Sequence, residues 1–199
     1  MTLTRSLILA ALMIAASCGP ICAQERWQRF PPQRDLQFYA PRNRLEEFES
    51  RPATVLIKGR TWVGTARAQV GSARVEATEI KDASNSTRAR GVTITLSGGE
   101  PSIEVRCLID YEEIDPLVKA IDTVAKADET ITKLTHFEVH YRTRGDFEVI
   151  VFKQMAGGIA VAIEGGFFDR TRLFLTLEEL TRLRWMIAQA KDRLDEIKG

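Results

Sequence analysis

The chain has 199 residues, of which 44% are hydrophobic and 28% are charged, and its formal net charge is +1. This composition is ordinary for a soluble globular protein of about one domain. The near balance of charge argues against a dedicated nucleic-acid binder and against a polybasic membrane-surface protein, because both classes usually carry an excess of basic residues.

Residues 1–23 have the pattern of a bacterial signal peptide. Arg5 supplies the positive n-region, and the apolar stretch of roughly ten residues that follows is too short for a membrane-spanning helix. Cleavage after Ala23 would release the mature chain, and we favour this ending. The alternative is a degenerate lipobox that ends at Cys18, which would then carry lipid. We therefore expect an exported protein, periplasmic or secreted, with a lipid anchor at Cys18 as the alternative.

Residues 24–52 are rich in proline, arginine and glutamine, which predicts an extended linker with at most a helical turn at Leu45–Glu49. Residues 53–199 then form a single domain. Cys107 is the only cysteine of that domain, so a disulfide framework is not possible there. On an apolar strand face, we expect its thiol to behave as a small hydrophobic group.

A sequence pattern occurs twice in this domain. Gly91–Gly99 lines up with Gly158–Gly166, and both are alternating strands that open at a glycine and close at a Gly-Gly turn. Ile109–Ile114 lines up with Leu175–Leu180 at nearly the same offset. We infer two tandem repeats, which span about 61–128 and about 133–199.

Each repeat has the pattern of four strands followed by a helix. The expected strands lie near 61–69, 74–81, 91–97 and 103–109, and then near 134–142, 146–153, 158–164 and 171–175. The expected helices run from about 111 to 127 and from about 177 to 197. Each helix has one apolar stripe, so we expect it to cover a face of its own antiparallel sheet. The predicted fold class is α+β, with two tandem ββββα repeats that form one pseudo-symmetric domain.

Both helix starts have the spacing of a capping box. Thr176 precedes Glu179 by three residues, and Asp110 precedes Glu113 by three residues. Pro116 lies inside the first helix, which indicates either a kink or a later start with Asp115 as the cap. The paired glutamates in these first turns are explained by capping and by the helix dipole, so they do not indicate acid–base catalysis.

The tandem strand and helix order over residues 61–197 resembles the Whirly-type single-stranded DNA-binding fold, which contains two such units. The basic Lys-Gly-Lys-type motif that Whirly proteins use on nucleic acid has no counterpart here. Residues 109–115 and 137–146 also resemble an uncharacterised family of exported bacterial proteins. That resemblance implies a similar fold and location, but it implies no activity and no site residues.

His136, Glu138 and His140 alternate with apolar residues, so the sequence predicts that these three polar side chains share one strand face. Two imidazoles at this spacing can chelate zinc, and the carboxylate could be a third ligand or a base. The simpler interpretation is the polar side of a half-exposed strand. Arg144-Gly145-Asp146 lies where a turn is expected, and we interpret it as that turn rather than as an adhesion site.

No catalytic motif stands out, so we expect a non-enzymatic binding or scaffolding module of the bacterial envelope with a protein or glycan partner and no cofactor. The first alternative is a metal-dependent hydrolase that uses His136 and His140. The second is a single-stranded nucleic-acid binder, by fold analogy alone, although zero net charge in the mature chain predicts no nucleic-acid partner. We expect no membrane span in the mature chain, and the sequence does not indicate an oligomeric state.

Overall fold

The computed structural model describes residues 40–98 and 103–197, within the compact unit Ala40–Gly199. The predicted signal peptide, the lipidation candidate Cys18 and the first part of the predicted linker lie outside these residues. Among the helices that the structure describes, none is both long and apolar enough to cross a membrane.

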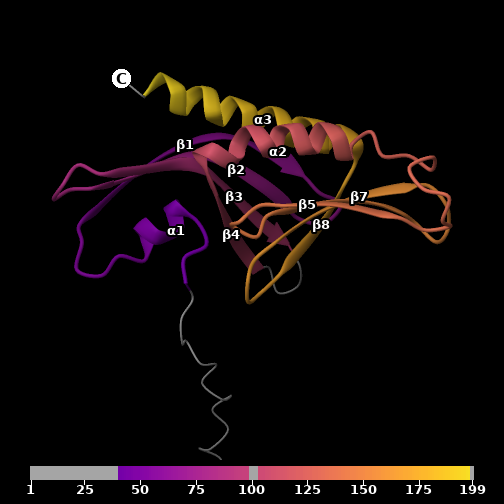
Figure 1. The fold of residues 1–199 in the computed structure, drawn as a ribbon, viewed down its shortest axis with the longest axis horizontal. Coiled ribbons are helices and arrows are strands. Elements are labelled where there is room, and N and C mark those ends of the chain that lie inside the picture. Colours follow the sequence, from indigo (N-terminus) through magenta and orange to yellow (C-terminus); the bar gives the residue numbers. More distant parts are fainter. Residues whose placement is uncertain (1–39, 99–102, 198–199) are drawn as a thin grey trace, which may run out of the picture. The chain divides into compact units, whose positions relative to one another are not determined.

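Eight strands form two four-stranded antiparallel sheets, and each sheet is followed in the chain by a helix (Figure 1). The predicted α+β class and the order of elements are therefore confirmed. In each sheet the strands are neighbours in chain order. The elements of the first half are β1 (Leu56–Arg67), β2 (Ser72–Asp82), β3 (Arg88–Gly98), β4 (Ile103–Asp110) and α2 (Tyr111–Val124). Those of the second half are β5 (Glu138–Arg142), β6 (Glu148–Lys153), β7 (Ile159–Gly165), β8 (Thr171–Leu175) and α3 (Leu177–Glu196).

The helices do not each cover the sheet of their own repeat, and that expectation is wrong. α3 packs against β1, β2 and β3 of the first sheet. Near its start, Glu179 accepts a hydrogen bond of 2.9 Å from the backbone N–H of Arg67, and at its end the carbonyl of Ile197 accepts one of 2.7 Å from Arg90. α2 packs against β5 and β6 as well as against β3 and β4. The long second helix thus lies on the sheet of the other half.

The lengths of the elements explain why α3 packs on the first sheet. The 20 residues of α3 extend about 30 Å at 1.5 Å per residue. The second sheet has strands of five to seven residues, about 17–23 Å long, which cannot cover such a helix. Strands of 11 and 12 residues in the first sheet extend about 36–40 Å and are long enough to cover this helix. Small residues on the first sheet also let α3 approach, since a Cβ at Gly64 would lie 2.4 Å from the Sδ atom of Met186.

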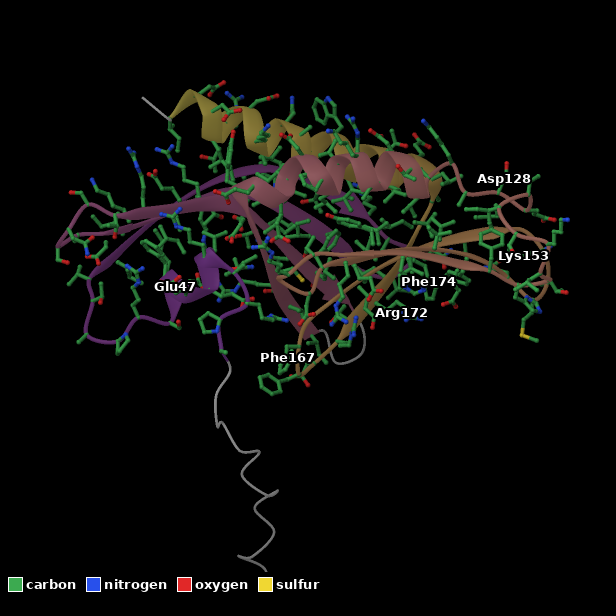
Figure 2. All side chains as sticks on the ribbon, in the orientation of Figure 1. Glu47, Asp128, Lys153, Phe167, Arg172 and Phe174 are labelled. Carbon is green, nitrogen blue, oxygen red and sulfur yellow. The ribbon has the colours of Figure 1, made fainter. Side chains whose placement is uncertain are left out.

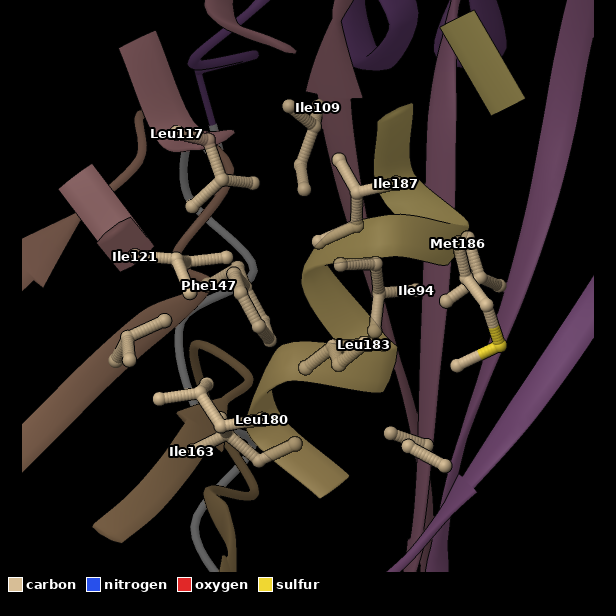
Figure 3. Packing of buried hydrophobic residues seen from close by; sticks show 14 of the residues in the cluster. Ile94, Ile109, Leu117, Ile121, Phe147, Ile163, Leu180, Leu183, Met186 and Ile187 are labelled. Atoms are coloured by element: carbon tan, nitrogen blue, oxygen red, sulfur yellow. The ribbon is translucent and has the colours of Figure 1, made fainter. Parts of the chain in front are cut away.

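One continuous apolar core joins both sheets and both long helices. Figure 3 shows Ile94 of the first sheet, Phe147 of the second half, Ile121 of α2 and Leu183 of α3 in this core. All four side chains are fully or almost fully buried. Because neither sheet has a core of its own, the two halves should fold and unfold together.

A short helix, α1 (Arg44–Glu49), lies within the range predicted as linker and packs against β2, β3 and β4. Leu45 and Phe48 are buried there in a second, smaller cluster with Ile80. The described end of that range therefore belongs to the folded unit, since the apolar side chains of α1 cover part of the face of the first sheet that α3 leaves uncovered.

The two expected capping boxes differ in outcome. Thr176 accepts a hydrogen bond of 3.1 Å from the N–H of Glu179, which confirms the first half of its capping box, whereas the Glu179 carboxylate accepts from Arg67. Asp110 makes no such bond in its own helix, and this part of the prediction is wrong. Its carboxylate instead accepts hydrogen bonds from the backbone N–H groups of Arg44 (2.8 Å) and Leu45 (3.0 Å), at the start of α1. α2 nevertheless begins at Tyr111 and includes Pro116, so the alternative start at Pro116, with Asp115 as the cap, is also wrong.

Candidate functional site

The face of the second sheet that points away from the long helices carries part of the predicted metal site. Side chains alternate along each strand, and the residues that join the core point to the other side. Figure 2 shows Arg172 and Phe174 of β8 on the side turned away from α2 and α3. We call this surface the outer face; it comprises Glu138, His140, Arg142, Glu148, Ile150, Phe152, Ala160, Ala162, Glu164, Arg172 and Phe174.

The three predicted site residues do not all lie on this strand. Glu138 and His140 belong to β5, but His136 precedes the first residue of β5 by two positions and its side chain is exposed. Within the part of the chain that the structure describes, there is no group of three or more histidine, cysteine, aspartate or glutamate residues that could hold a metal ion.

His140 is held between two carboxylates. Its Nδ1 lies 2.8 Å from Oε1 of Glu148, across the strand pair, and its Nε2 lies 2.9 Å from Oε2 of Glu138. The hydrogen bond to Glu148, followed by that to Glu138, raises the pKa of His140 although partial burial opposes the shift. Both ring nitrogens are therefore used in hydrogen bonds within the protein, and the protonated imidazolium is the form that these bonds favour.

The network continues from Glu148 to β7 and β8. Arg170 donates to Glu148 at 3.0 Å and pairs with Glu164 at 2.8 Å, and Arg172 also donates to Glu164 at 2.8 Å. Desolvation raises the pKa of Glu148, but hydrogen bonds from His140 and Arg170 outweigh it, and the net pKa is lowered. Glu148 is therefore an ionised acceptor at neutral pH, and together with Glu164 it holds the surrounding cationic side chains in place.

Glu148 and Glu164 of this network are largely shielded from solvent, whereas its arginines are exposed. The side chains of Glu148 and Glu164 are 13% and 12% exposed, whereas those of Arg142 and Arg172 are 49% and 52% exposed. Phe174, which contacts Phe152 edge to face with ring centroids 6.4 Å apart, is also exposed. Besides Glu138 and His140 on β5, the outer face thus presents guanidinium groups and an aromatic ring to its surroundings.

Sequence reasoning missed most of this network. The alternation of residues 136–140 indicated His140 and Glu138, but Glu164, Arg170 and Arg172 come from a different hairpin. The available signal was the alternation in β8, where Arg172 and Phe174 occupy the polar positions of the strand. Which of them would lie next to His140 depends on the pairing of β5 with β6 and of β7 with β8, which the sequence does not specify.

Two other candidates serve the fold. Burial raises the pKa of the Cys107 thiol to about 11, so this side chain behaves as the small hydrophobic group that was expected. Asp146 of the Arg144-Gly145-Asp146 turn is 5% exposed and pairs with Arg42 and Arg142. A buried aspartate is not accessible to an adhesion receptor, so the interpretation as a turn is confirmed.

Compared with protein-family models, with curated proteins and with solved structures, the chain matches none of them. The interpretation of the outer face therefore depends on its own chemistry.

Proposed function

We propose that the chain is an exported, non-enzymatic binding module of the bacterial envelope and that it binds an acidic protein surface on its outer face. The observation that carries this proposal is the layering of charge on that face, with half-buried glutamates below and exposed arginines above. A guanidinium group has five N–H donors, and the ion pairs with Glu164 use only part of those of Arg172. The remaining donors can bind carboxylates of a partner.

The residue types of the outer face support a protein partner. Arginine and aromatic side chains are enriched where protein interfaces carry most of their binding energy. Arg172 and Phe174 lie two residues apart on β8, on the same side of the strand. The ion pairs beneath hold Arg170 and Arg172 in place, which lowers the entropy that binding would otherwise cost.

The test compares two matched double variants in cross-linking of the full chain to its partners in intact envelope. R172E/F174S changes the outer face of the second sheet. R74E/W62S makes the same kinds of change on the first sheet, where Arg74 and Trp62 are also exposed. We expect a discrete complex that R172E/F174S abolishes, that R74E/W62S preserves, and that weakens as salt concentration rises. Loss of the complex in both variants, or in the first-sheet variant alone, would contradict the proposal.

The alternative functions predict different results. A metal-dependent hydrolase would contain stoichiometric zinc that a His136→Ala/His140→Ala variant loses, measured by mass spectrometry on protein purified without a histidine tag. In that enzyme, His140 would have to release Glu138 or Glu148 in order to ligate the metal. A nucleic-acid binder would retain single-stranded DNA at physiological salt, and a glycan binder would retain envelope polysaccharide. Each of these outcomes would show that the proposed acidic protein partner is wrong.

The internal duplication supports pseudo-symmetry of the two halves. Asp110 and Thr176 both have extended backbone, with φ and ψ of −63° and 153° and of −81° and 162°, and each is followed directly by a helix. We propose that the halves superpose strand for strand with Asp110 on Thr176, as the Whirly-type resemblance implies. The intact mass of the exported protein would test the location and would separate cleavage after Ala23 from lipidation at Cys18.

A further inference from the structure

A second candidate site lies at the other end of the unit, between α1, the start of α2 and the β5–β6 turn. An open hollow of about 770 Å³ is lined there by charged side chains, and this volume is within the range of about 300–1,000 Å³ that small-molecule sites occupy. The residues on which the argument depends are Arg44 and Phe48 of α1, Glu112 and Glu113 of α2, and Arg144 of the turn.

Glu113 is the central feature of this hollow. Its residue is 9% exposed, and its Oε1 accepts a hydrogen bond of 3.0 Å from the backbone N–H of Arg144. Its Oε2 is buried and accepts no hydrogen bond from any residue that the structure describes. An unsatisfied oxygen of a buried carboxylate is costly, and a cation beside the carboxylate would offset part of that cost.

Three arginines line the same hollow, and one of them, Arg51, pairs with Glu47 at 2.9 Å. The guanidinium group of Arg44 lies over the ring of Phe48, 5.9 Å from its centroid, and no described carboxylate forms an ion pair with it. The side chain of Arg144 is 71% exposed, with its Nε 4.0 Å from Oε1 of Glu113. Planar guanidinium groups bind carboxylates through paired N–H donors. The hollow therefore combines an acceptor that lacks a donor with two donors suited to a carboxylate.

We propose that this hollow binds a small zwitterion of about dipeptide size. Its ammonium group pairs with the carboxylate of Glu113 from the hollow, and its carboxylate binds Arg44 and Arg144. No residue of this hollow belongs to the outer face of the second sheet, so neither proposal depends on the other.

The test is calorimetric titration of the full chain with three forms of one dipeptide. These are L-alanyl-L-alanine, its N-acetyl derivative, which lacks the ammonium group, and its C-terminal amide, which lacks the carboxylate. We expect the free dipeptide to bind and each blocked form to bind at least about tenfold more weakly. Equal binding of the N-acetyl form, or no binding of any form, would overturn the proposal.

Three variants locate the site. Glu113→Gln keeps an oxygen that accepts from Arg144 but loses the negative charge, and we expect it to weaken the free dipeptide by about tenfold or more. Glu112→Gln is the matched control, since it removes the adjacent carboxylate of the same hollow. Arg44 is exposed, so the Arg44→Gln variant should fold normally. It should weaken binding of the free dipeptide but leave binding of the amide form unchanged. Equal effects of Glu113→Gln and Glu112→Gln, or an equal effect of Arg44→Gln on both ligands, would exclude the assigned contacts.

Discussion

The two sheets share strand order and direction but differ in the length of their strands. Those of the first sheet have eight to 12 residues and those of the second have five to seven. The longer sheet takes the longer helix, although that helix follows the shorter sheet in the chain. In this protein the length of an element, and not its neighbour in sequence, decides which surface it covers.

The faces that the two long helices leave uncovered also differ. In the first sheet, α1 covers part of that face through Leu45 and Phe48. In the second sheet, His140, Glu148 and Arg172 form part of an ionic network that stays at the surface. The first sheet thus uses its second face for further packing, and the second sheet has an ionic network on its own second face.

The largest expected effect tests whether the halves share one core. Phe147→Ala in the second half should lower the free energy of unfolding by about 3–5 kcal/mol, because it removes a fully buried ring. Fluorescence of Trp62 and Trp185 in a Trp27→Phe background should change at the same denaturant concentration as far-UV circular dichroism. Phe174→Ala, at an exposed ring, should cost about 1 kcal/mol or less. Two separate transitions would contradict the shared core.

A smaller effect compares the equivalent residues Asp110 and Thr176. Asp110→Ala removes a buried carboxylate that accepts from two N–H groups of α1, and we expect a loss of about 2–3 kcal/mol. Thr176→Ala removes one capping bond and should cost about 1 kcal/mol. Hydrogen exchange should show faster exchange of the Arg44 and Leu45 amides in the first variant only. Unchanged exchange there would show that Asp110 does not anchor α1.

The position of α3 on the first sheet is tested on β1. Gly64→Leu should destabilise by about 1–3 kcal/mol, because its side chain would collide with Met186 of α3. Gly59→Leu on the same strand meets no close neighbour and should change stability by about 0.5 kcal/mol or less. If α3 covered the second sheet instead, equilibrium denaturation would give the same result for both variants.

The smallest effect is the pH dependence contributed by His140. Its pKa is raised in the folded state, so its stabilising contribution is fully present below the unfolded value of about 6.5 and is lost as pH rises through the folded value. Glu148→Gln should lower this pKa more than Glu138→Gln does, because Glu138 is far more exposed. NMR titration of the imidazole, assigned with a His136→Asn variant, measures both. The reverse order would show that Glu138 is the stronger partner.

Much of the architecture could be predicted from local pattern. Alternation and glycine turns gave all eight strands, and the end of β8 matches its prediction at residue 175. The start of α3 was also correct, because Thr176 caps it through a contact only three residues away. α1 (Arg44–Glu49) coincides with the helical turn expected at Leu45–Glu49, and Asn43 caps it locally, but its attachment to the fold depends on packing and on Asp110 from a distant strand.

The candidate sites depended more on tertiary structure. Alternation placed Glu138 and His140 on one face, but it did not indicate that Glu148 and Glu138 would each take one nitrogen of the same imidazole. The capping-box spacing also assigned Glu113 a capping role, whereas the carboxylate of Glu113 accepts a hydrogen bond from the β5–β6 turn. A carboxylate three residues after an aspartate has the same local pattern whether it caps a helix or binds elsewhere.

The sequence by itself determined the elements and their order, because strand alternation, glycine turns and capping residues act over a few residues. Only the tertiary structure decided which helix covers which sheet and which charged groups meet, since these depend on the match of lengths and surfaces between segments far apart in the chain. α3 on the first sheet and Asp110 at the start of α1 are the clearest cases. Both satisfy a requirement that the local sequence leaves open, namely where a long apolar stripe is buried and where a buried carboxylate finds its donors.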